Sequence, residues 1–155
     1  MLDATTAPPE APGAEAAEET DAIEAAALVD EPPPPPPFDA VRVTADLEGA
    51  VESGDAVLAL STALDAAVGH RAVGHPDAAI DACYLALATN PADPDLHMAL
   101  AEIYLDRGWR TAAADKLVLL ARLTSLTDDT AAQERLCAIA RARLPGEPRL
   151  ASVCA

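Results

Sequence analysis

The stretch GHPDAAID at residues 74–81 recurs as GWRTAAAD at residues 108–115, 34 positions later. Each copy begins with a glycine, continues into small residues and ends with an aspartate. A glycine between two apolar-periodic stretches is typical of the turn inside a helical hairpin. Units of this length cannot bury their apolar faces alone, so the repeat predicts helical hairpins that stack on one another.

Start and stop signals around these turns predict six helices. Aspartates at positions 55 and 93 stand where N-caps are expected, and one of Asp128 and Asp129 caps the last helix. Pro76 and Pro94 suit the first turn of a helix, where a missing N–H costs nothing. The expected helices are 39–52, 55–73, 76–89, 94–107, 110–123 and 130–144, followed by a single turn near 149–153.

The residues that carry the period resemble the tetratricopeptide repeat (TPR) family, whose pattern reads W-x2-L-G-x2-Y, A-x3-F, P. The matching residues are Ala67, Ala79 and Pro91 in segment 60–93, and Leu100, Ala101, Tyr104 and Ala113 in segment 94–127. Departures stand at the tryptophan, aromatic and second-proline positions, which hold Ala63, His70, Cys83, His97, Leu117 and Ser125. The resemblance covers about two repeats plus flanking helices. It implies an all-α fold, a right-handed superhelical stack of antiparallel helix pairs.

Composition divides the chain into two parts. Residues 1–37 contain nine acidic residues and no basic residue, and they end in six consecutive prolines at 32–37. We expect a disordered acidic tail whose proline run forms a stiff polyproline II spacer of about 19 Å, at 3.1 Å per residue. Docking of that run on a partner is the alternative. Residues 38–155 are the expected TPR-like helical repeat domain.

Charge narrows the class of partner. The formal net charge is −16, and residues 38–155 contain seventeen acidic against ten basic residues. An acidic field repels phosphates, so nucleic acid and anionic membrane surfaces are excluded as partners. A basic or amphipathic protein partner fits better, and the alternative is that the charge serves solubility alone.

Localisation follows from segments that the sequence lacks. No apolar stretch approaches 18 residues, and acids rather than bases follow Met1, so we expect neither a membrane span nor a secretory peptide. Cys83, Cys137 and Cys154 are odd in number and widely spaced. They are interpreted as free thiols, two of them on apolar helix faces, in a cytoplasmic protein.

Residue types that could support catalysis are not arranged for it. His70, His75, His97 and Cys83 lie close in sequence but lack the spacing of a metal site. There is no glycine-rich phosphate loop and no G-x-S-x-G serine. We therefore expect no enzymatic activity, metal or cofactor, and we expect Trp109 to serve in packing rather than as a binding anchor.

The TPR resemblance places a binding groove on the first helix of each repeat. By register, the residues are Ser61, Leu64, Val68 and Arg71, then Asp95, Met98, Glu102, Leu105 and Asp106, then residues near Asp129 and Ala132. The resemblance implies an apolar floor (Leu64, Val68, Met98 and Leu105) beside an acidic edge (Asp95, Glu102 and Asp106). Such a groove suits an amphipathic or basic helix or an extended peptide. The predicted function is a non-enzymatic interaction module.

The alternative function is structural. Two repeats are few for a free-standing array, since three or more are usually needed for stability. The chain would then be a terminal cap of a larger TPR array or a self-associating unit. In that case the apolar residues Val41 and Leu47 of helix 39–52 would pair with a second copy as a homodimer.

Overall fold

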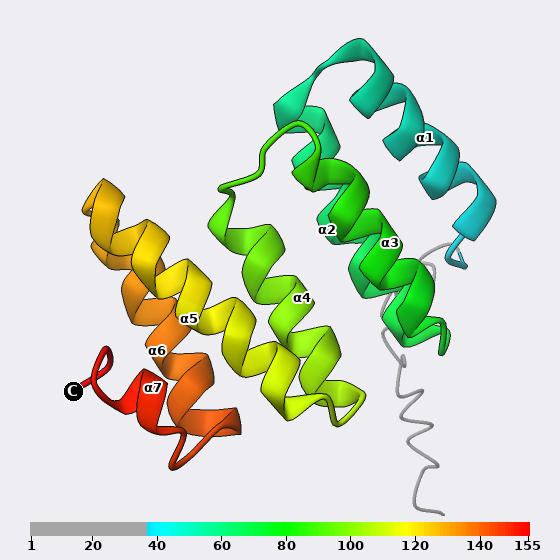
Figure 1. Cartoon of the computed structure of the whole chain (residues 1–155). Helices are drawn as coiled ribbons and strands as arrows, with labels where there is room; N and C mark the ends of the chain where they lie inside the picture. The colour runs from blue at the N-terminus through cyan, green and yellow to red at the C-terminus, as the bar shows by residue number, and fades with distance from the viewer. Residues whose placement is uncertain (1–36) are drawn as a thin grey trace, which may run out of the picture. The chain divides into compact units, whose positions relative to one another are not determined.

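The computed structural model describes residues 37–155, and the predictions for residues 1–36 lie outside this part of the chain. The described residues are all-helical and contain no strand. In chain order, the helices are α1 (Ala40–Ser53), α2 (Ala56–Ala72), α3 (Pro76–Leu87), α4 (Pro94–Asp106), α5 (Arg110–Thr127), α6 (Thr130–Arg143) and α7 (Pro148–Ala151) (Figure 1). None of these helices is both long and apolar enough to cross a membrane. The predicted order of six helices and one further turn is confirmed.

Aspartate side chains begin four of the helices. Asp39, Asp55, Asp93 and Asp129 each accept a hydrogen bond from a backbone N–H in the first turn of α1, α2, α4 and α6. These bonds satisfy donors that have no partner inside the helix. The predicted caps at Asp55, Asp93 and Asp129 are confirmed, and the cap at Asp39 was not predicted.

Asp93 is the most buried of these caps, and its replacement tests how much a cap contributes. Its side chain accepts from the N–H groups of Asp95 and Leu96, at 2.9 Å and 3.0 Å. Asp93→Ala is expected to lower the free energy of unfolding by about 1–2 kcal/mol, because buried donors lose their acceptor. Urea unfolding followed by circular dichroism measures the change. Asp65→Ala, an exposed change on α2, is the control and should alter the midpoint little.

The repeated glycines form the predicted turns. Gly74 and Gly108 adopt φ values of +81° and +77°, which favour glycine over any residue with a side chain. Gly74 separates α2 from α3, and Gly108 separates α4 from α5. Two helical hairpins therefore follow from the repeat, as predicted.

Helix α5 is longer than the sequence predicted. It continues to Thr127 rather than ending near residue 123, and Asp128 ends it at a φ of +55°. The first repeat has Pro91 at the corresponding end, whereas the second has no proline there. The hydroxyls of Ser125 and Thr127 donate to the carbonyls of Ala121 and Leu123 and add to the last turn.

Each helix from α1 to α6 packs against the next. In addition, α2 contacts α4, and α4 contacts α6. The core between them is built mainly from alanine and leucine. The largest fully buried side chains are Leu47, Leu96, Leu100, Ile103, Leu117, Leu120, Leu136, Leu150 and Cys83. Because alanine has little side chain, the helices approach closely and the few leucines fill most of the space between them.

A disulfide bond joins Cys137 of α6 to Cys154 near the end of the chain, with their Cα atoms 5.3 Å apart. The prediction of free thiols is therefore wrong for these two cysteines, which the tertiary structure brings together across 17 residues. Cys83 is free and buried in α3, where desolvation raises its pKa to about 11. The bond removes the sequence argument for a reducing compartment.

Candidate functional site

Helices α2, α4 and α6 line a groove of about 390 Å³. Six of the nine groove residues predicted on the first helices of the two repeats lie in its wall: Leu64, Val68, Arg71, Asp95, Met98 and Glu102. They come from α2 and α4, which are separated in sequence by α3. The register carried over from the repeat thus brings most of the predicted residues into one surface.

Three predicted residues lie elsewhere, and one of them, Ser61, is exposed outside the groove wall. Leu105 faces the core and is only 8% exposed, and Asp106 is exposed beyond the groove wall. Met98 does line the groove but is 7% exposed, so most of its side chain packs inside the protein. Fewer apolar side chains than predicted are therefore exposed on the groove floor, because α4 is buried against its neighbours over most of its circumference.

Helix α6 contributes residues that the sequence register missed. Arg135, Ala138 and Ile139 line the groove. The predicted positions do not: Ala132 is fully buried and Asp129 caps the helix. Helix α6 begins 36 residues after α4 rather than 34, because α5 is longer than its counterpart. The missing proline at the end of the second repeat was the signal that could have corrected the register.

Arginines neutralise the predicted acidic edge. Arg71 pairs with Glu102 at 3.5 Å and also with Asp106. Arg135 of α6 pairs with Asp95. The prediction of an acidic side is therefore corrected to an edge of ion pairs, in which α2 and α6 supply the positive charges and α4 supplies the negative ones.

Asp106 lies between two arginines. Arg143 approaches it to 2.9 Å, and Arg71 pairs with it from the other repeat. Desolvation raises the pKa of this carboxyl, but the hydrogen bonds from Arg143 and Arg71 outweigh it and hold the pKa below its ordinary value. Asp106 thus joins α2 to α6 through α4.

The apolar part of the groove remains accessible. Val68 is 66% exposed, and Leu64 and Ile139 are half-buried. Ala67 and Ala138 lie between them and leave space because their side chains are small. An exposed apolar strip beside fixed polar groups is typical of surfaces that accept a peptide side chain.

The remaining aromatic residues have structural partners. Trp109 is 45% exposed, its ring lies 5.7 Å from that of Tyr104, and the Arg107 guanidinium lies 4.2 Å above it. The hydroxyls of Tyr84 and Tyr104 are 2.7 Å apart and share a hydrogen bond. Trp109 therefore packs on its own turn, as predicted, while one side of it stays exposed.

The histidines and Cys83 do not assemble a metal site. Among residues 37–155, no three His, Cys, Asp or Glu side chains lie close enough together to hold a metal ion. His97 pairs through Nε2 with the carbonyl of Pro91 at 2.9 Å. His70 packs edge-on against Phe38, with ring centroids 5.0 Å apart. Its pKa is lowered, first by burial and then by His75.

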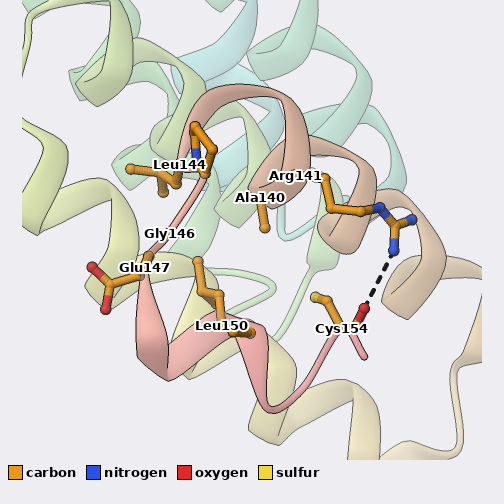
Figure 2. Close-up of a pocket in the computed structure, with 9 residues that line it drawn as sticks. Ala140, Arg141, Leu144, Gly146, Glu147, Leu150 and Cys154 are labelled. Atoms are coloured by element: carbon orange, nitrogen blue, oxygen red, sulfur yellow. Dashed lines mark hydrogen bonds between the residues drawn. The ribbon is translucent and has the colours of Figure 1, made fainter.

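A second hollow of about 350 Å³ lies between α6 and α7 (Figure 2). Its polar side chains are already engaged: Arg141 donates to the carbonyl of Cys154 at 3.4 Å, and Glu147 pairs with Arg149. Sequence reasoning missed this hollow because it exists only when the chain end folds back beside α6.

The predicted self-association face of α1 is also corrected. Leu47 is 1% exposed and belongs to the core, whereas Val41 is 82% exposed. The two residues therefore do not form one exposed strip.

Comparisons of the chain with protein-family models, with curated proteins and with solved structures find no match.

Proposed function

We propose that residues 38–155 form a TPR-like superhelical array of helix pairs that binds a segment of a partner protein and catalyses no reaction. The occupant of the groove is one amphipathic helix or extended peptide. The observation that supports this proposal is the groove itself, in which Val68 stays exposed between two half-buried apolar residues and a row of ion pairs.

The groove favours a partner segment with an apolar face. Leu64, Val68 and Ile139 offer apolar area that water covers in the free protein, and covering it stabilises a complex by roughly 25 cal/mol per Å². The ion pairs of Arg71 and Arg135 hold the edge in place before binding. Because those pairs neutralise the groove, a basic partner would respond to the acidic charge of the rest of the domain.

A matched pair of variants tests the proposal. A displayed library of short helical peptides is selected against the full chain, and the affinity of the best binder is measured by fluorescence anisotropy. Val68→Glu combined with Ala138→Glu is expected to weaken binding at least tenfold, because carboxylates would be covered by an apolar face. Val57→Glu makes the same change at an exposed residue of α2 outside the groove and should leave affinity unchanged. If the double variant and the native chain bound the peptide with equal affinity, binding in the groove would be refuted.

Self-association is the second candidate, and exposed valines at the start of α1 and α2 favour it. Val41 and Val57 are 82% and 79% exposed. Light-scattering mass over a hundredfold concentration range distinguishes the two candidates. A concentration-dependent dimer that Val57→Glu disrupts supports self-association, whereas a folded monomer at all concentrations leaves the groove as the binding surface.

A further inference from the structure

The net negative charge of the described helices lies in one half of the sequence. Residues 39–93 contain nine acidic residues and two basic ones, whereas residues 94–155 contain eight of each. One of the two bases, Arg71, is already paired with Glu102 and Asp106 of α4. Helices α1 to α3 therefore carry uncompensated carboxylates, which attract a cation.

Two of these carboxylates lie at a pocket between α1, α2 and α3, with a volume of about 280 Å³. Glu48 comes from α1 and Asp81 from α3, and within residues 37–155 neither has an arginine or lysine partner. Leu47 and Leu85 add apolar wall. The pocket shares no residue with the groove.

A buried imidazole in the pocket wall is the second observation. His70 of α2 is only 5% exposed, and its Nδ1 has no hydrogen-bond partner. A buried polar nitrogen without a partner costs free energy, which a bound donor can recover. Burial and then His75 lower the pKa of this imidazole, so near neutral pH it is uncharged. A neutral imidazole has one ring nitrogen that accepts a hydrogen bond.

We propose that this pocket binds the guanidinium of an arginine side chain presented by a basic segment of a partner protein. The carboxylates of Glu48 and Asp81 accept its N–H groups, and the neutral His70 offers a further acceptor. The methylene stem of the arginine packs on Leu47 and Leu85. This site goes beyond the proposed groove and stands independently of it, since neither site uses a residue of the other.

The acceptor arrangement favours arginine over a metal ion or lysine. No three His, Cys, Asp or Glu side chains in the part of the chain that the structure describes converge as metal ligands would. Glu48 and Asp81 approach from different helices, and a guanidinium presents five donors in a planar fork that can reach separated acceptors. An ammonium is a compact point charge and fits acceptors that converge on one spot.

The test uses the full chain labelled with nitrogen-15 and the probe N-acetyl-arginine N-methylamide. Its citrulline analogue has nearly the same shape but no charge and is the control ligand. Saturable chemical-shift changes are expected at amides around Thr44, Glu48, His70 and Asp81 with the arginine probe. Equal shifts with the citrulline analogue, or shifts spread over all helices, would overturn the proposal.

Charge-matched variants separate the pocket from the general acidic field. Glu48→Gln combined with Asp81→Asn is expected to weaken arginine binding at least tenfold. Asp46→Asn combined with Glu52→Gln removes the same charge from exposed residues of α1 outside the pocket and should change binding less than twofold. Equal losses of arginine affinity in both double variants would show general electrostatic attraction to the acidic helices and no specific site. All four positions are exposed, so the fold should survive, and a circular dichroism spectrum checks this.

Discussion

Replacing Leu100 by alanine is expected to lower the free energy of unfolding by about 2–5 kcal/mol. Leu100 is fully buried in α4, the helix that contacts α2, α3, α5 and α6. The loss combines the transfer free energy of the removed atoms with the cost of the cavity that they leave. Because a small domain has about 5–15 kcal/mol of stability, this one change removes a large share of it.

The effect should lie toward the upper part of that range because the surrounding core cannot collapse into the cavity. Many buried residues of the core are alanines, whose side chains have no rotamers with which to fill space. Urea unfolding followed at the helical circular dichroism band measures the change. Leu126→Ala, at a leucine that is 82% exposed, is the matched control and should shift stability by less than about 0.5 kcal/mol. A loss below 1 kcal/mol for Leu100→Ala would contradict this packing.

Loss of the disulfide is expected to lower the free energy of unfolding by about 3 kcal/mol, because the bond closes a loop of 17 residues in the unfolded chain. Cys154→Ser is the change, and unfolding with and without reductant is the measurement. The native chain should lose stability on reduction, while the serine variant should show no further response. Equal stability of the native chain in both conditions would contradict the prediction.

Without the disulfide, the loss of structure should begin at the C-terminal end. Helix α7 has only four residues, so the buried Leu150 and the bond to Cys137 hold it in place. Freed of the bond, the last turn should exchange its amide protons fastest, and the hollow beside α6 (Figure 2) should lose its outer wall. Alkylation under denaturing conditions checks the bond directly: one thiol should react before reduction and three after it.

The groove shows how far a repeat register can be carried. Val68 and Glu102 were predicted from the period, and they line the same surface because α2 and α4 begin and end where local signals place them. Ile139 was missed because α6 begins 36 residues after α4 instead of the 34 of the repeat. The acidic edge was predicted wrongly because the sequence does not show that Arg135 lies opposite Asp95.

The sequence by itself determined where the helices lie. Caps such as Asp93 and turn glycines such as Gly74 act over three or four residues, so their effect is visible in the chain as written. The tertiary structure alone decided which side chains meet across helices: Cys137 with Cys154, Arg71 with Asp106, and His70 with the pocket between α1 and α3. These contacts depend on how far each helix extends and how it rotates against its neighbours, and in an alanine-rich core that depends on packing rather than on any local signal.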